Sequence, residues 1–325
     1  MSELRWHPLL QQWVITATHR QERTFFPPDD YCPLCPTKEG GFPTEVPSES
    51  YEIVAFENKF PSLRRNAPEP AVEETGLYKV RPAEGVCEVI LYSSKHQGSL
   101  TDHSEEEINN LIHVWTDRYN DLGALDFVDY VFIFENKGKE IGVTLAHPHG
   151  QIYAYPFIPP IVQREIDASA DHMEKTGRCL FCDILAEEKS DGRRIVAQND
   201  GCVAFIPFYA RYPYEVHIAP HEHRTCLPDF SDGEKMDLAR ILKTILLKYD
   251  NLWGFSFPYM MVIHQKPTAK GDFGHFHFHI EFYPPYRTKD KLKFLAGSES
   301  GAGVFINDTL AEEKAAELRG IEPKT

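Results

Sequence analysis

Two long segments of this chain repeat one another at a nearly constant spacing. Residues 87–104 (CEVILYSSKHQGSLTDHS) align without a gap to residues 214–231 (YEVHIAPHEHRTCLPDFS), 127 positions further on. Residues 129–156 align to 258–284 at a spacing of 128, and both segments contain a run of alternate histidines. Self-similarity at a fixed period is the signature of a repeated structural unit. The sequence therefore predicts two copies of one domain.

A Cys-x-x-Cys motif also occurs once in each half, as CPLC at 32–35 and CLFC at 179–182. Each half then runs in the same order: the cysteine motif, a Glu-Val…His segment, a helix with an acidic start and a histidine-rich strand. Residues 157–178 read as a proline turn followed by a helix, so the join is expected there. We expect an N-terminal domain at 1–160 and a C-terminal domain at 161–325.

Local patterns in the two halves indicate the same secondary structure. Residues 104–122 and 231–252 each open with Ser and acidic residues, as helix N-termini do, and carry apolar residues at helical spacing. Strand-like runs precede each helix, and two more strands follow it. This grouping predicts an α+β fold: duplicated domains that join into one broad, mostly antiparallel sheet with helices packed on it.

Composition limits the partners and the compartment. The 325 residues are 42% hydrophobic and 26% charged, with a net charge of −15, which is typical of a globular protein and argues against nucleic-acid or membrane-surface binding. No apolar run is long enough to span a bilayer, and the N-terminus lacks a leader pattern. We therefore expect a cytoplasmic protein whose seven cysteines are reduced, with the Cys-x-x-Cys pairs serving as metal ligands.

Two metal sites are predicted, one in each half. Two thiolates and two imidazoles form a tetrahedral set suited to structural zinc. The first set is Cys32, Cys35, His96 and His147, and the equivalent second set is Cys179, Cys182, His223 and His275. A rival for the second site, a carboxylate–imidazole set suited to iron or zinc, is Glu165, His264, His279 and Glu281. We favour the cysteine set, since the second Cys-x-x-Cys would otherwise be unexplained.

The motif HPHGQ, at 147–151, indicates a catalytic site. If His147 binds metal, His149 points the same way along a strand, and a neutral imidazole held through its other nitrogen is a good nucleophile for phosphorus. Gly150 leaves room for a phosphate, and Gln151 supplies an amide donor for a phosphoryl oxygen.

Other polar residues are candidate phosphate ligands. Asn136, in the segment ENKG, and Thr144 lie shortly before HPHGQ. Arg20 and Arg23, three apart near the N-terminus, form either a phosphate clamp or a solvated face.

HPHGQ preceded by FENKG, together with CPLC and a C-terminal HIEFYPP, resembles the galactose-1-phosphate uridylyltransferase family of the histidine-triad superfamily. The resemblance extends over essentially the whole chain. It implies a ping-pong reaction in which His149 takes UMP from UDP-glucose and galactose 1-phosphate then accepts it. Gln151 stands where hydrolases of the superfamily carry a third histidine, which marks a transferase. The family is homodimeric, with each active site completed by the partner subunit.

The resemblance also implies residue roles. Arg20, Arg23, Asn58, Asn136 and Thr144 would line the nucleotide and phosphate site, and Lys293 and Glu299 match positions near the sugar. Cys32, Cys35, His96 and His147 match the family's structural zinc site.

This chain departs from the best-known members at three places. Glu281 stands where the last of three histidines would complete an iron site with Glu165, and Lys59 replaces an acidic residue near the nucleoside. The glutamine that contacts the sugar is missing from the segment GSESGAGVFINDTL. The second Cys-x-x-Cys resembles a two-zinc branch that includes plant-type ADP-glucose phosphorylases.

Three hypotheses follow: a hexose-1-phosphate uridylyltransferase, an ADP-sugar phosphorylase or adenylyltransferase, and a non-catalytic nucleotide-binding module. A His149→Ala substitution separates the third from the first two, because a binding module would keep its affinity.

Overall fold

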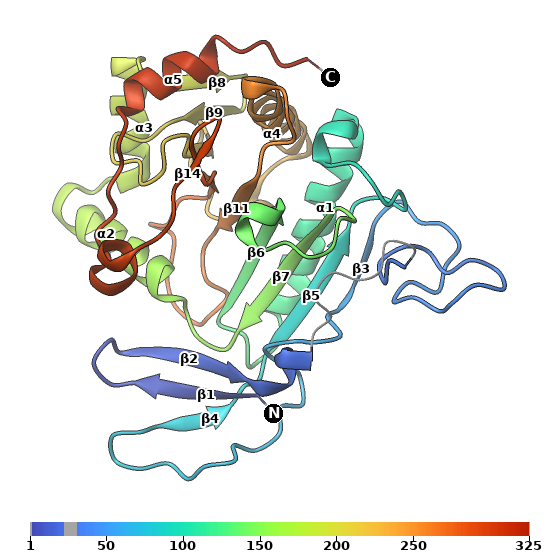
Figure 1. Ribbon diagram of the computed structural model, residues 1–325. Helices are drawn as coiled ribbons and strands as arrows, with labels where there is room; N and C mark the ends of the chain where they lie inside the picture. Colours follow the sequence, from blue (N-terminus) through green and yellow to red (C-terminus); the bar gives the residue numbers. More distant parts are fainter. Residues whose placement is uncertain (1, 23–30, 325) are drawn as a thin grey trace.

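The centre of the protein is one nine-stranded sheet, seen in a computed structural model that describes residues 2–22 and 31–324 (Figure 1). Its strands follow the order β3-β5-β7-β6-β11-β12-β10-β9-β8, and each neighbouring pair is antiparallel. These strands are β3 (Val54–Glu57), β5 (Val86–Leu91), β6 (Tyr130–Lys137), β7 (His149–Tyr155), β8 (Ile195–Gln198), β9 (Cys202–Phe205), β10 (Val216–Pro220), β11 (Tyr259–His264) and β12 (His279–Tyr283). The expected broad antiparallel sheet is confirmed.

Two small sheets accompany the large one. A three-stranded sheet contains β1 (Ser2–His7), β2 (Gln12–Ala17) and β4 (Val80–Pro82), in the order β2-β1-β4. Figure 1 shows it below β5 and β7 of the large sheet. A two-stranded ribbon pairs β13 (Tyr286–Thr288) with β14 (Lys291–Leu292).

The helices cover both faces of the large sheet. They are α1 (Glu105–Gly123), α2 (Pro160–Thr176), α3 (Leu180–Asp191), α4 (Asp232–Trp253) and α5 (Ala311–Arg319), with short turns at Thr18–Glu22, Leu100–Asp102, Lys139–Ile141, Leu227–Asp229 and Ser298–Ala302. Buried residues of α1, α4 and α5 belong to the main hydrophobic core on one face. On the other face, α2 and α3 pack over the sheet through smaller clusters around Val162 and Leu185.

The two long helices begin where the sequence predicts. The Ser104 hydroxyl accepts the Glu107 backbone N–H at 3.1 Å at the start of α1, and Ser231 accepts that of Glu234 at 3.3 Å at the start of α4. Each glutamate also accepts the backbone N–H of its serine, which completes a capping box. The two helices therefore occupy equivalent places in the two halves.

The halves are related about the boundary between β6 and β11. Across it, Glu135 pairs with Met261 and Ile133 pairs with Ile263. Ile133 and Met261 are equivalent at a spacing of 128, as are Glu135 and Ile263, so each pair becomes the other when the two strands are exchanged. On either side the order is β6, β7, β5, β3 and β11, β12, β10, β9. The duplicated domain therefore builds one continuous sheet rather than two.

The repeat register in the histidine strand differs from the expected one. The His149 ring donates from Nδ1 to the carbonyl of His147 at 2.8 Å, and His279 does the same to His277 at 3.0 Å. The equivalent residues are therefore 130 apart, so His147 corresponds to His277 and not to His275. A slip of two residues keeps every side chain on its own face of a strand, and three alternate histidines give the sequence no means to detect it.

None of the helices in residues 2–22 and 31–324 combines the length and the apolar character that a bilayer crossing requires.

Candidate active site and metal centres

The nucleophile candidate lies at the start of β7, beside a cavity of about 290 Å³. The Nδ1–H bond to the His147 carbonyl fixes the ring and leaves Nε2 as the basic nitrogen. Four other predicted site residues line the same cavity: Gln151, Asn136, Thr144 and Asn58. A histidine nucleophile, amide groups and a hydroxyl around one cavity suit attack on a bound phosphate.

The floor and one wall of this cavity are apolar. Phe56 on β3 neighbours Val89 on β5, which neighbours Gln151 on β7, so the three lie in one row across the sheet. Pro33 and Leu34, from the first Cys-x-x-Cys loop, line the wall. Neighbouring strands are about 4.8 Å apart, so the row reaches about 10 Å from Gln151, the length of a nucleoside. An apolar surface that continues from the candidate nucleophile suits a flat base.

A charged pair stands at the rim of the cavity. The Lys59 ammonium contacts Glu45 Oε1 at 3.1 Å, and Glu45 raises the pKa of Lys59. Both residues line the cavity. Lys59 stands where the resemblance predicts an acidic residue. Its partner Glu45, in the segment that follows the first Cys-x-x-Cys motif, supplies a carboxylate at this place instead. Nothing in the sequence near Glu45 pointed to this role.

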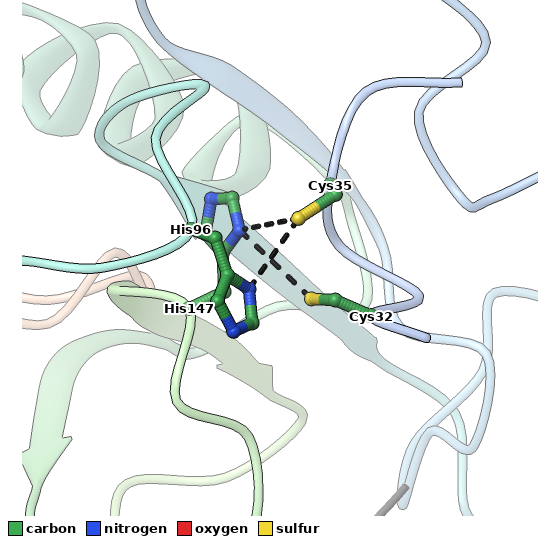
Figure 2. A group of neighbouring side chains, drawn as sticks. All are labelled: Cys32, Cys35, His96 and His147. Atoms are coloured by element: carbon green, nitrogen blue, oxygen red, sulfur yellow. Dashed lines mark hydrogen bonds between the residues drawn. The ribbon is translucent and has the colours of Figure 1, made fainter. Parts of the chain in front are cut away.

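The first metal group forms as predicted from Cys32, Cys35, His96 and His147 (Figure 2). The Cys35 sulfur lies 3.4 Å from Nδ1 of His96 and 3.6 Å from Nδ1 of His147, and the Cys32 sulfur lies 4.0 Å from His147. Ligands of a tetrahedral zinc stand about 3.5 Å apart for a sulfur and a nitrogen. Burial and the Cys32 thiol raise the pKa of Cys35 to about 11, so a bound cation would be needed to keep the Cys35 thiol ionised.

The four candidate ligands connect the strand of the candidate nucleophile to the cavity wall. The His147 ring donates from Nε2 to the carbonyl of Ser93 at 2.8 Å, a second contact that fixes the ring toward the sulfurs. The Tyr51 hydroxyl lies 3.1 Å from the same nitrogen. His149, at the start of β7, follows His147 by two residues. Leu34, which lies between the two cysteines, forms part of the cavity wall. A metal here would therefore set the position of the site without taking part in the reaction.

The second metal group forms in the C-terminal half with one correction. Cys179, Cys182 and His223 are present as predicted, but the fourth member is His277 and not His275. The His277 Nδ1 lies 3.7 Å from the Cys179 sulfur and 3.5 Å from the Cys182 sulfur. The two-residue slip in the repeat register explains the error. Burial, with His223 close by, lowers the pKa of His277 to about 3, which favours the neutral imidazole that a metal binds.

The rival carboxylate–imidazole set, Glu165, His264, His279 and Glu281, also forms a group. Both Glu165 oxygens lie within 3.0 Å of His264 Nδ1, and Glu281 lies 3.4 Å from His279. Burial alone would lower the pKa of His264, but the neighbouring carboxylates outweigh it and raise the pKa to about 9. This set shares no residue with the cysteine set, so the two are neighbours rather than alternatives.

Other predicted substrate residues lie outside the cavity lining. Arg20 donates to the Phe60 carbonyl and to the Ser62 hydroxyl, both at 3.0 Å, and so supports the loop after Asn58. Lys293 and Glu299 pair at 3.5 Å, after β14 in the C-terminal half. Arg23 lies outside the described residues.

A larger hollow of about 570 Å³ lies between residues 119–124 and 266–274. It contains none of the predicted site residues and lies at the C-terminal end of α1, so we assign no chemistry to it.

The fold and the cavity together place a candidate nucleophilic histidine on a duplicated frame that carries Cys/His groups able to hold metal. Residues 1–159 match the family described as "Galactose-1-phosphate uridyl transferase, N-terminal domain", and residues 165–324 match its C-terminal domain. The chain therefore belongs to the galactose-1-phosphate uridylyltransferase family.

Individual relatives agree over nearly the full length. A "Galactose-1-phosphate uridylyltransferase" from Thermotoga maritima is 44% identical over 323 residues, 99% of each chain. One from Rattus norvegicus is 32% identical over 99% of this chain and 88% of the relative.

Solved structures agree as well. "Structure of uridylyltransferase" superposes with a TM-score of 0.86 at 36% identity over 98% of this chain and 97% of that one. An "ADP-Glucose Phosphorylase from Arabidopsis thaliana" has a TM-score of 0.75 at 25% identity, with each chain covered completely.

Proposed function

We propose that this chain is a nucleotidyltransferase that moves UMP from UDP-glucose to galactose 1-phosphate (EC 2.7.7.12). One observation carries the proposal: His149, with Nδ1 bonded to the His147 carbonyl, lines a cavity together with Gln151 and an apolar row of nucleoside length. Family membership supports the choice of substrates, since relatives 44% and 32% identical carry that name.

The proposed reaction has two steps with one covalent intermediate. The Nε2 lone pair of His149 attacks the α-phosphorus, and the bond to the β-phosphate oxygen breaks, releasing glucose 1-phosphate with that electron pair. Nδ1 of His149 keeps its proton throughout and donates it in a hydrogen bond to the His147 carbonyl, which stabilises the positive ring. A phosphate oxygen of galactose 1-phosphate then attacks the same phosphorus and restores neutral His149. Gln151 donates to the phosphoryl oxygen in both steps.

Zinc is the metal we propose for Cys32, Cys35, His96 and His147 and for the corrected second set, Cys179, Cys182, His223 and His277. The support is the donor chemistry and the ligand spacings. Zinc would supply structural order at each set, because four protein ligands leave no open position. Iron or zinc suits the mixed set around Glu165, His264 and His279.

We further propose a cytoplasmic homodimer with two domains, 1–160 and 161–325. The halves meet at β6 and β11, and the family matches end and begin near this division. Lys293 and Glu299 do not line the cavity of their own chain. We place them in the sugar site of the partner subunit. Cross-mixing of a His149→Ala subunit with a Lys293→Ala subunit tests this, since the heterodimer would keep one intact site.

An ADP-sugar phosphorylase is the second candidate, supported by the full-length likeness to the Arabidopsis structure and by the second Cys-x-x-Cys group. A non-catalytic binding module is the third.

Intact-mass spectrometry separates these candidates. The protein is mixed with UDP-glucose or with ADP-glucose at mildly alkaline pH, where a histidine phosphoramidate persists. We expect a uridylyl adduct that is absent from His149→Ala and that galactose 1-phosphate discharges as UDP-galactose. An adenylyl adduct alone would establish the phosphorylase, and no adduct with retained binding would leave the module.

A further inference from the structure

A carboxyl group is buried at the main hydrophobic core, on the strand next to β7, which carries the candidate nucleophile. Glu135 on β6 is 4% exposed and accepts hydrogen bonds from the hydroxyls of Tyr92 and Tyr259, both at 3.1 Å. Burial raises the pKa of Glu135 to about 7. Among the residues that the structure describes, no cation stands within ion-pair distance of Glu135. Lys137, two residues further along the same strand, pairs with Asp250 at 2.9 Å instead. Such burial is unfavourable, so the arrangement calls for a reason.

This carboxyl group and its tyrosine partner touch the strand at one residue. Glu135 is the register neighbour of Gly150, which lies between His149 and Gln151. A Cβ atom on Gly150 would stand 2.2 Å from the Tyr92 hydroxyl oxygen. The hydroxyl therefore fills the space that the missing side chain leaves. The glycine of HPHGQ is therefore needed to make room for the Tyr92 hydroxyl on the core side of the strand, and not only to admit a phosphate on the cavity side.

The second half supplies an internal comparison. Strand register relates Gly150 to Ile280 and Glu135 to Ile263. Tyr92, two residues beyond Ile90, corresponds to Pro220, two residues beyond Ile218. All three equivalents are apolar, so none of these three positions carries a polar side chain in the second half. Of the two equivalent places, the one beside the strand of the nucleophile candidate carries the polar arrangement.

We propose that Tyr92 and Glu135 are positioning residues that set the backbone of β7 at Gly150 for the transfer reaction. Successive side chains of a strand point to opposite faces, so the support under Gly150 fixes where His149 and Gln151 stand on the cavity face. Tyr259 fixes the other oxygen of Glu135 from β11. The inference rests on the proposed function, and neither residue touches the substrate.

Single-turnover kinetics test the inference. Tyr92→Phe and Glu135→Gln are mixed with excess UDP-glucose, and the rate of adduct formation on the full-length protein is followed by rapid quench and intact mass. A displacement of about 1 Å at a reacting atom lowers a rate by about 100-fold. We expect roughly 10- to 100-fold slower adduct formation in both variants, with the apparent dissociation constant of UDP-glucose changed by less than about 3-fold. Ile263→Val, at the position equivalent to Glu135, is the matched control and should react at the wild-type rate.

A double substitution checks the contact itself. Gly150→Ala brings a methyl group against the Tyr92 hydroxyl and should nearly abolish adduct formation. Adding Tyr92→Phe removes the oxygen at 2.2 Å and leaves the ring carbon at 3.2 Å. The double variant should therefore react faster than Gly150→Ala alone.

Folded Tyr92→Phe and Glu135→Gln proteins that react at the wild-type rate would overturn the inference, as would a double variant no faster than Gly150→Ala. If Glu135→Gln does not fold, Tyr92→Phe and the double variant decide. A wild-type protein that forms no adduct would instead refute the proposed function.

Discussion

The two halves share one topology but differ around the strand that follows the paired histidines. In the first half His149 lines an open cavity with Gln151. In the second half the equivalent His279 makes the same bond to the carbonyl two residues earlier, yet Phe181 stacks on it with ring centroids 4.6 Å apart. Glu281, in the place of Gln151, contacts its other nitrogen at 3.4 Å. A shared backbone therefore orients both rings, and only the surroundings make one of them a candidate nucleophile.

The largest expected effect comes from removing the nucleophile. His149→Ala should lose turnover by on the order of 10⁴-fold or more, because no other group can form the covalent intermediate. UDP-galactose formation measured with excess UDP-glucose and galactose 1-phosphate gives the comparison. His113→Ala, a half-exposed position on α1 outside the cavity lining, is the control and should retain activity. Substantial turnover by His149→Ala would rule out its assigned role.

Breaking the two cysteine groups should separate activity from stability. Cys35→Ser releases His147 and the cavity wall, so we expect a loss of activity of roughly 100-fold. Cys182→Ser disturbs the half without the cavity and should chiefly lower the thermal midpoint. Metal content by elemental analysis, activity and thermal unfolding are measured on both. Equal activity losses in the two variants would contradict the proposal that only the first cysteine group positions the active site.

If both groups bind zinc as proposed, the first group should release it first under a chelator, because His96 is exposed whereas Cys179 and His277 are buried. Release of zinc to a colorimetric indicator should show a faster phase that parallels the activity loss. A single phase, or activity that follows the slower one, would contradict this.

The buried Glu135 should make the stability of the protein depend on pH. Its pKa is raised from 4.5 to about 7 in the folded state, so between these values the folded protein keeps a proton that the unfolded chain loses. Its contribution therefore becomes less favourable as pH rises from about 4.5 to 7, by at most about 3 kcal/mol. Urea unfolding at pH 5 and at pH 7.5 should show a smaller decline for Glu135→Gln. Parallel declines in the two proteins would refute the buried titration.

The smallest effect is expected at the cavity rim. Lys59→Ala breaks an ion pair whose lysine side chain is 62% exposed, so the free energy of unfolding should change by less than about 1 kcal/mol. The KM for UDP-glucose should rise a few-fold while kcat stays constant, because the pair borders the nucleoside end. A fall in kcat with constant KM would place the pair nearer the reaction.

Much of the site could be predicted from sequence, because its chemistry depends on short motifs. The recurrence of the cysteine and histidine set in the repeat brings Cys32, Cys35 and His147 together, and HPHGQ adds His149. The helix caps at Ser104 and Ser231 are local signals. Residues that depend on distant contacts could not be found in this way. Glu45 reaches the cavity only because the cysteine loop folds over β3 and β5.

The repeat illustrates a second limit. The gapless alignment of Glu88 with Glu215 conceals a change of face: Glu88 pairs with Arg118 of α1, whereas Glu215 bonds to His217 on the other side of the sheet. Strand alternation, rather than residue identity, decides which residues are equivalent. The alignment of His147 with His275 was also chosen by matching identical residues, but its slip of two leaves the face unchanged, so strand register rather than alternation reveals it.

Locating the nucleotide adduct by peptide mapping tests the central claim most directly. The protein is loaded with UDP-glucose in the absence of acceptor, digested at alkaline pH and sequenced by tandem mass spectrometry, with released glucose 1-phosphate counted per subunit. The account predicts one uridylyl group per subunit on His149 and none on the equivalent His279. A modification on His279, or release of glucose 1-phosphate with no histidine adduct, would contradict it.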